Sequence, residues 1–304
     1  MTSGLPTRPG TAPAAPASPA VLAGAVFWAL IWAGAFVATK AALRWAPPPV
    51  VVSARCIMAG GVLLAAAAPR AGRPTRRVLG RLALLGMLNN AAYLGLMAYA
   101  LPSISAGTAA ILSASTPLLV VCTAAALGQD KLTATRTIGL ALGFAGIAAT
   151  SLSRLNGADR PEGVLLGVVA VLALATGTLL TPRLTRGVDA ATATGWQAII
   201  GGAFLFVPAL LTARMHTLHL GWQLAGTLLF LGVGASVLGM TLWLGLIRWV
   251  GPTAASLAQF MPPLLGIALG HLLLGEPITT FELLATLPVA VGITLALRRP
   301  PRRL

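Results

Sequence analysis

Residues 108–147 read TAAILSASTPLLVVCTAAALGQDKLTATRTIGLALGFAGI, and residues 253–293 read TAASLAQFMPPLLGIALGHLLLGEPITTFELLATLPVAVGI. The two stretches share an ordered series of positions: T-A-A, P-L-L, an acidic residue, a threonine and G-I. The series keeps an offset of 146 residues after a one-residue slip that follows T-A-A. Because apolar sequences match each other by chance, it is the order of the series that indicates an internal duplication.

The composition around these stretches is typical of a membrane protein. Hydrophobic residues make up 57% of the chain, the mean hydropathy is +0.88 and only 9% of residues are charged, against about 25% in soluble domains. A helix needs roughly 20 apolar residues to cross a bilayer. Ten spans are predicted on this basis, at residues 20–40, 49–69, 79–100, 104–127, 135–153, 163–181, 191–211, 221–247, 253–274 and 280–297.

The duplication places five spans in each half of the chain. A repeated unit with an odd number of spans must insert upside down relative to its twin, as in many secondary transporters. The predicted fold is therefore an all-α integral membrane protein of ten transmembrane helices, arranged as two inverted five-helix repeats. We expect repeats over residues 20–153 and 163–298, between a disordered tail at 1–19 and a basic tail at 299–304.

The positive charge of the chain predicts its orientation. The formal net charge is +15, from 21 Lys and Arg against 6 Asp and Glu. Fifteen of the 21 cations fall in segments on the side of the termini, five fall on the opposite side, and Arg55 lies within a span. Cytoplasmic segments are enriched in Lys and Arg, so both termini are expected in the cytoplasm. Cations in short gaps between apolar runs do not indicate nucleic-acid binding.

Several motifs resemble one known family. They are FWALIWAGAFVATKAAL at 27–43, SARCIMAGGVLL at 53–64 and the whole segment 231–293 with LLLGEPIT at 272–279. In their order, the motifs are similar to those of the EamA-type members of the drug/metabolite transporter superfamily, over residues 20–298. Met261 precedes the prolines of the ninth span, where the family often has an acidic residue. The resemblance therefore indicates the fold and transport more strongly than it indicates a substrate.

The resemblance implies a secondary transporter of small organic molecules in a bacterial inner membrane. Many members of the family export amino acids, including aromatic ones, which makes amino-acid export the leading expectation. Others move sugars, nucleotide precursors or drugs, so a broad metabolite or drug exporter is the alternative. The direction of transport follows from the resemblance alone.

Arg55 is the one arginine or lysine that lies away from the ends of a predicted span. An arginine in the membrane is costly and usually faces a cavity or a partner. It could attract an anionic group such as a substrate carboxylate. It could instead reach the outer interface or bind backbone carbonyls, which is the commoner role a turn or two from the end of a span.

Polar residues and prolines interrupt the fourth and ninth spans at matching positions. Proline frees backbone carbonyls, which are tolerated in a membrane only where protein or water meets them. Such paired breaks are the best sequence indication of a substrate site between repeats, and they could also serve as hinges. The residues concerned are Ser113, Thr116 and Pro117 in the fourth span, and Gln259, Phe260, Pro262 and Pro263 in the ninth.

Aromatic and amide side chains supply further candidates. Trp28, Trp32 and Phe36 recur every four residues and form one stripe of the first span, which could line a cavity or pack against neighbouring helices. Substrate contact or helix packing are the two interpretations for the remaining candidates, which are Asn89, Asn90, Tyr93, Trp196 and Trp243.

The sequence gives no indication of catalysis. It has no H-E-x-x-H, no C-x-x-C and no acidic pair suited to a metal, so an enzyme, a metal site or a cofactor is not expected. A channel is disfavoured by the fused inverted repeat, and no ATP-binding motif or ATPase subunit is implied. All six carboxylates lie at span ends or in gaps, which leaves His271 as a weak candidate for proton coupling. The expected partners are a small substrate and the lipid bilayer, with the oligomeric state open and a monomer plausible.

Overall fold

We describe the fold from a computed structural model, which places residues 19–68, 74–126, 128, 133–154, 159–211, 218–278 and 280–296. These residues form helices joined by turns, and no β-strand occurs among them. The expected tails at 1–19 and 299–304 lie outside the described residues, apart from Pro19. The described chain is therefore the all-α molecule that its hydropathy predicts.

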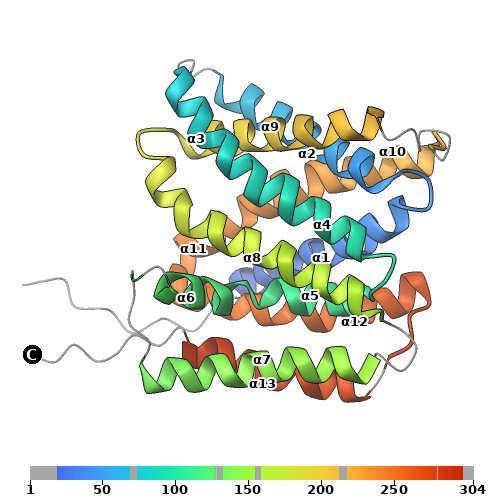
Figure 1. Ribbon diagram of the computed structural model, residues 1–304, viewed down its shortest axis with the longest axis vertical. Coiled ribbons are helices and arrows are strands. Elements are labelled where there is room, and N and C mark those ends of the chain that lie inside the picture. The colour runs from blue at the N-terminus through green and yellow to red at the C-terminus, as the bar shows by residue number, and fades with distance from the viewer. Residues whose placement is uncertain are drawn as a thin grey trace, which may run out of the picture.

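The helices of the first half follow the five predicted spans (Figure 1). A π-helical stretch, η1, joins α3 to α4, and a single residue separates α5 from α6. In chain order the elements are α1 (Pro19–Ala42), α2 (Pro48–Ala67), α3 (Arg76–Gly86), η1 (Met87–Ala92), α4 (Tyr93–Ala100), α5 (Ala106–Ala114), α6 (Thr116–Ala126) and α7 (Ala134–Arg154).

The helices of the second half repeat this pattern. A π-helical stretch, η3, again interrupts the third span, and a short 3₁₀ segment, η4, precedes α12. The elements are α8 (Pro161–Leu184), α9 (Ala190–Leu211), α10 (Trp222–Leu229), η3 (Phe230–Leu238), α11 (Gly239–Ala255), η4 (Ser256–Phe260), α12 (Met261–Leu274) and α13 (Thr280–Ala296).

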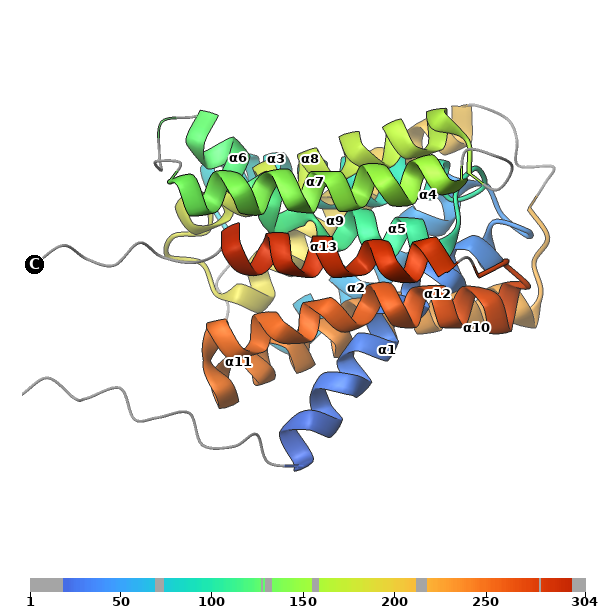
Figure 2. The same cartoon turned by 90° about the horizontal axis from the view of Figure 1, so that it is seen from below.

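The main contacts between helices of the first half and helices of the second have counterparts between the matching helices of the opposite halves. The second helix of each half packs along the other, α2 on α9, and so does the fifth, α7 on α13 (Figure 2). The fourth spans meet through α5 and α12, while α1 lies against α11 and α12 as α8 lies against α4 and α6. The two five-helix units are thus related by an internal symmetry, which makes the fold a bundle of two inverted repeats.

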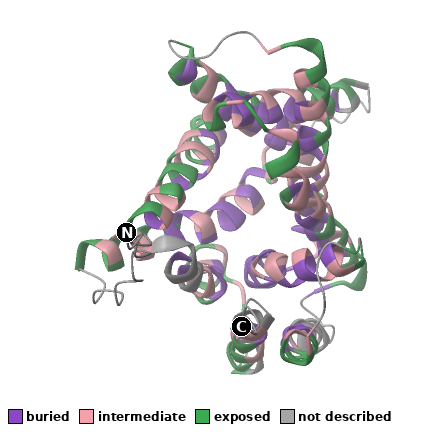
Figure 3. Cartoon of the chain, turned by 90° about the vertical axis from the view of Figure 1, so that its left-hand side faces the viewer, coloured by how far each residue is buried: buried purple, intermediate pink, exposed green. Residues whose placement is uncertain are grey.

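The surface of the bundle suits a bilayer. The spans formed by α1, α2, α3–α4, α8, α9 and α10–α11 are each long and apolar enough to cross one, and α5 and α6 together form a span bent by 40°. Large apolar side chains point outward, including Leu165, Phe204 and Leu272, which are 64, 52 and 74% exposed. Figure 3 shows buried residues facing the inside of the bundle. Soluble proteins rarely expose so much apolar surface, so these faces contact lipid.

Two faces of the bundle are used below to locate the site. The first turn of α1 and the last turn of α13 lie at the same end of the bundle, which we call the terminal face (Figure 2). The opposite end, where α1 ends near Lys40, is called the far face.

The prolines of the fourth and ninth spans begin new helical segments. Pro117 is the second residue of α6, and Pro262 and Pro263 follow Met261 at the start of α12. A proline in the first turn of a helix has no intrahelical N–H bond to lose. Both spans are therefore broken at the repeat-related positions that the sequence predicts, with a fresh helix start at each break.

Glycine pairs bring α2 and α9 close together. A Cβ atom added at Gly60 would lie 2.7 Å from the carbonyl oxygen of Gly195, and one added at Gly202 would lie 3.1 Å from that of Ser53. The Ser53 hydroxyl donates to the Gly202 carbonyl at 2.8 Å. Small residues permit this backbone approach, which supplies van der Waals contact where lipid offers no hydrophobic driving force.

This contact predicts different effects for two neighbouring glycines of α2. Gly60→Ala should lower the free energy of unfolding relative to Gly61→Ala by about 1–3 kcal/mol, because overpacking separates α2 from α9. A Cβ atom at Gly61 meets nothing within 4 Å. Both substitutions therefore change the helix propensity equally, and only Gly60→Ala introduces a close contact with α9. Unfolding of the purified variants in detergent measures the difference, and equal stabilities would contradict the packing.

Candidate functional site

A cavity lies between α1, α2 and α4, in the half of the bundle nearer the far face. Its volume is only about 40 Å³, because the lining side chains leave narrow gaps between them. A substrate could occupy it fully only if these helices move apart. The lining residues are Trp32, Ala35, Phe36, Thr39, Val51, Val52, Arg55, Tyr93, Leu94, Met97, Ala98 and Leu101. Four of the predicted site residues, Trp32, Phe36, Arg55 and Tyr93, are brought together here.

Arg55 connects this cavity to the second half of the chain. Its Nε donates to the hydroxyl of Ser236 at 2.9 Å, and that hydroxyl donates to the carbonyl of Leu231 at 2.8 Å within η3. A guanidinium has five N–H donors, and Arg55 makes no other hydrogen bond and no ion pair within the described part of the chain. The side chain therefore points into the bundle, not toward the interface, with four N–H groups left for a ligand.

Ser113 and Thr116 belong to the wall behind the cavity. The Tyr93 and Ser113 hydroxyls lie 2.8 Å apart, and Thr116 donates to the Ser113 carbonyl at 2.6 Å. These bonds satisfy polar groups at the break between α5 and α6, as a low-dielectric interior requires. Of the predicted polar patch in the fourth span, Ser113 thus reaches a cavity residue and Thr116 supports the break.

A stack of tryptophans lies on the terminal side of the cavity. The ring of Trp28 stacks on Trp243 with a centroid separation of 4.7 Å and on Trp32 at 5.8 Å. Trp28 is 4% exposed, and its indole N–H has no hydrogen-bond partner among the described residues. The sequence predicts Trp28 and Trp243 as independent candidates, whereas the structure makes them one contact between α1 and α11.

The other predicted residues lie away from the cavity lining. Asn89 donates to Gln197 of α9 at 3.2 Å, and Asn90 accepts from the Cys56 thiol at 3.9 Å, so both amides of η1 bridge helices. Gln259 and Phe260 are half-buried in η4, and Trp196 is half-buried on α9. His271 is exposed near the end of α12, with Nδ1 2.8 Å from the Glu276 carbonyl oxygen.

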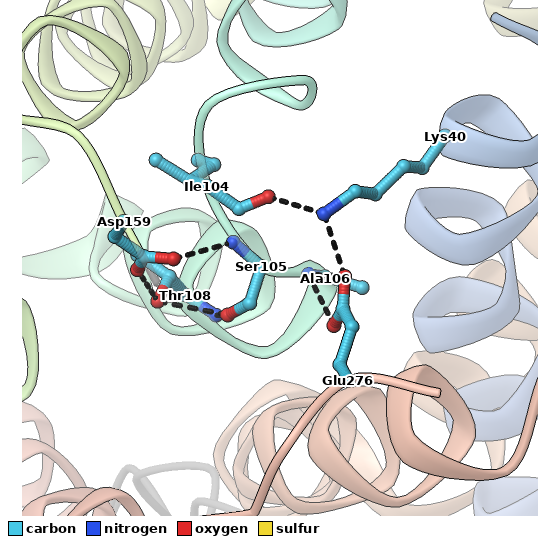
Figure 4. A network of polar contacts seen from close by, with 7 residues as sticks. All are labelled: Lys40, Ile104, Ser105, Ala106, Thr108, Asp159 and Glu276. Atoms are coloured by element: carbon cyan, nitrogen blue, oxygen red, sulfur yellow. Dashed lines mark hydrogen bonds and ion pairs between the residues drawn. The ribbon is translucent and has the colours of Figure 1, made fainter. Parts of the chain in front are cut away.

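A network of polar contacts on the far face, which we call the latch, joins four separate parts of the chain (Figure 4). Lys40 of α1 forms an ion pair with Glu276 at 2.6 Å and donates to the Ile104 carbonyl at 2.7 Å. Glu276 also accepts from the Ala106 amide at 3.0 Å, which caps the start of α5. Anionic groups are favoured at the N-terminus of a helix.

A second carboxylate holds the same turn from another side. Asp159, which follows α7 and precedes α8, accepts from the Ser105 amide at 2.8 Å and from the Thr108 hydroxyl at 2.5 Å. The latch thus consists of Lys40, Glu276, Asp159 and residues 104–108, and its members come from both halves of the chain. Charge-assisted hydrogen bonds of this kind are stronger than neutral ones.

Beside the latch, a hollow opens at the far face. The hollow has a volume of about 450 Å³ and is lined by Lys40, Leu43, Arg44, Pro102, Leu274, Gly275, Glu276 and Pro277. Neighbouring residues line the two spaces: Thr39 and Leu101 face the cavity, while Lys40 and Pro102 face the hollow. Opening the latch would therefore connect the cavity to the far side of the membrane.

The latch and Ser236 are parts of the site that sequence reasoning missed. Lys40 ends the first span, where an interfacial anchor is the ordinary interpretation, and the structure pairs it with Glu276 instead. The available signal was a lysine and an acidic residue predicted on the same face of the membrane. Their pairing depends on helix packing across 236 residues of sequence separation.

An apolar bundle of two inverted repeats is the architecture of a membrane transporter, and here the first repeat lines a cavity whose arginine, Arg55, bonds to Ser236 of the second. The chain belongs to the EamA-like transporter family, whose profile matches residues 20–152 and again residues 161–298. It is thus a multi-pass membrane transporter and not an enzyme.

Relatives and a solved structure agree with this assignment. The chain is 27% identical over 273 residues to the uncharacterised transporter YvbV of Bacillus subtilis, covering 88% of each chain. It is also 27% identical to the uncharacterised inner membrane transporter YedA of Escherichia coli K12, covering 88% of this chain and 87% of the relative. A crystal structure with 20% identity aligns with a TM-score of 0.64 over 91% of this chain and 96% of the other, which shows the fold alone.

The latch predicts an energetic coupling between Lys40 and Glu276. In a double-mutant cycle of Lys40→Met and Glu276→Gln, the coupling between the two side chains should be about 1–3 kcal/mol in the free energy of unfolding, measured in detergent. We expect this size because both side chains are largely buried. The exposed pair Arg160 and Glu162, 4.0 Å apart, is the matched control and should show no measurable coupling. Additive effects of the Lys40 and Glu276 substitutions would contradict the latch.

Proposed function

We propose that this transporter is a secondary carrier that exports small organic metabolites, with amino acids, aromatic ones among them, as the leading substrate class. The observation that supports this proposal is the cavity, where the guanidinium of Arg55 lies beside Trp32, Phe36 and Tyr93. A guanidinium binds a carboxylate strongly, and aromatic faces suit an apolar or aromatic body. A broad exporter of metabolites or drugs is the second candidate, since the lining is mostly apolar.

The proposed mechanism is alternating access by the repeats at 20–153 and 163–298. The cavity lies between the Trp28–Trp243 stack on its terminal side and the latch on its far side. A substrate enters when the tryptophan stack parts, and it leaves when the latch opens. The broken fourth and ninth spans supply places where each repeat can bend. In this mechanism the described conformation, with the tryptophans stacked and the latch formed, corresponds to the occluded intermediate of the cycle.

The proposed location is a bacterial inner membrane with both termini in the cytoplasm. The excess of Lys and Arg on the terminal face supports this orientation, and one relative is named an inner membrane transporter. The latch then faces the periplasm, and export requires it to open after the substrate has bound.

Alternating access predicts that weakening the latch exposes the cavity to the periplasm. Thr39→Cys, in a chain with Cys56 and Cys122 replaced, should react slowly with a membrane-impermeant maleimide added outside intact cells. Glu276→Gln should increase that rate about tenfold, because the loss of roughly 1.4 kcal/mol from the closed state shifts the equilibrium by this factor. Trp222→Cys, at a residue 81% exposed on the far face, should label rapidly in both backgrounds.

An unchanged rate at Thr39→Cys in the Glu276→Gln background would exclude the latch as the gate. Rapid labelling without that substitution would contradict the occluded conformation.

Transport itself is tested in proteoliposomes with labelled amino acids, sugars and lipophilic cations. A carrier for amino acids should show saturable uptake and counterflow, in which unlabelled substrate inside accelerates entry of the labelled one. Saturable flux of sugars or cations in place of amino acids would favour the broad exporter. Flux that never saturates and shows no counterflow would contradict a carrier and indicate a channel.

A further inference from the structure

We infer that the cavity selects organic monoanions, in preference to zwitterions and cations, and that their movement through this protein carries net charge. This inference rests on the proposed function in one respect, that the cavity around Arg55 is the transport site. Among the small organic metabolites of the proposed function, it favours compounds with one carboxylate, an apolar body and no ammonium group, in place of the amino acids named there as the leading class.

The first argument is the charge of the cavity. Within the described part of the chain, Arg55 is the only charged residue that lines the cavity, and no carboxylate lines it. The four described carboxylates lie elsewhere. Glu276 and Asp159 hold the latch, Glu162 lies on the surface near Arg160, and Asp189 bonds the Thr192 amide at the start of α9. A charge in a low-dielectric interior is costly without a partner, so the empty cavity is deficient by one negative charge.

The second argument concerns what a zwitterion would lack. An amino acid brings an ammonium group, which needs a carboxylate or several good acceptors once it leaves water. Among the described residues, the lining supplies only two hydroxyl oxygens as side-chain acceptors: Thr39, which donates its proton to the Ala35 carbonyl at 2.7 Å, and Tyr93, which lies 2.8 Å from the Ser113 hydroxyl. Neither carries a negative charge. A bound monoanion neutralises the charge of Arg55. A zwitterion has no net charge and leaves the cavity with one positive charge, and a cation raises that to two.

The third argument concerns the driving force. A monoanion that crosses with no counter-ion moves one charge, and a membrane potential of 100 mV, negative inside, favours its exit about 50-fold at equilibrium. Such export needs no proton or sodium ion. The sequence agrees, because all six carboxylates lie at the ends of spans or between them. The potential alone would then drive net export.

Binding of three matched probes tests the selectivity. We would measure equilibrium binding of 3-phenylpropionate, L-phenylalanine and phenethylamine, which share one aromatic body, to the purified full chain. The anion should bind at least tenfold more tightly than the other two. Equal or tighter binding of phenylalanine or phenethylamine would overturn the inference, and so would a failure of the anion to bind.

Substitutions then locate the preference. Arg55→Gln should remove it, and Arg55→Lys, which retains the charge, should keep most of it, so that a folding defect is distinguished from loss of charge. Arg44→Gln is the matched control, because Arg44 lines the hollow and not the cavity. An anion preference that survives Arg55→Gln but is lost in Arg44→Gln would overturn the assignment to the cavity.

A flux experiment separates this inference from the proposed function. In proteoliposomes clamped with potassium and valinomycin, uptake of 3-phenylpropionate should rise when the interior is made positive and fall when it is made negative. Selective binding without any flux would contradict the transport proposal and leave the anion site standing. Saturable amino-acid flux that ignores the potential, with no preference for the anion, would support the transport proposal and overturn the inference.

Discussion

The absence of water from the bilayer interior is the constraint on which this structure depends. Every backbone N–H and C=O group there must find a partner within the protein, which restricts the spans to helices. Threonine hydroxyls on these helices bond to carbonyls four residues earlier, as Thr39 does to Ala35 and Thr181 to Gly177. Irregular backbone is confined to the π-helical stretches and to the breaks of the fourth and ninth spans, where neighbouring helices cover it.

The same constraint separates the charges of the chain into two kinds. Lys40 and Glu276 pair with each other, and both they and Asp159 bond to the turn between α4 and α5, so their charges stabilise one arrangement of the far face. Arg55 is held in place by the hydroxyl of Ser236 but not neutralised by it. A paired charge serves structure, whereas an unpaired one in a cavity marks the place where a ligand of opposite charge completes the site.

Much of the fold follows from the sequence, because hydropathy, span length and the ordered repeat are properties of single helices and of the chain order. The breaks at Pro117 and at Pro262 are likewise local. The site was predictable only in part: the stripe of Trp32 and Phe36 and the buried Arg55 identify the cavity. Their partners were not predictable, because Ser236 and Glu276 reach Arg55 and Lys40 through packing between distant spans. Asn89 and Asn90 were candidates because they are polar residues inside a span. The structure instead shows their amides bonded to Gln197 and Cys56 of neighbouring helices, where they hold the helices together.

The central claim is that the cavity between α1, α2 and α4 holds the carboxylate of a substrate against Arg55. Anomalous diffraction from crystals of the protein with 3-(4-bromophenyl)propionate tests it most directly, because bromine can be located without reference to the rest of the map. The account predicts a bromine peak in the cavity, beside Trp32 and Phe36, with the carboxylate at the guanidinium of Arg55. A peak in the hollow beside Lys40 and Arg44, with the cavity empty, would contradict it.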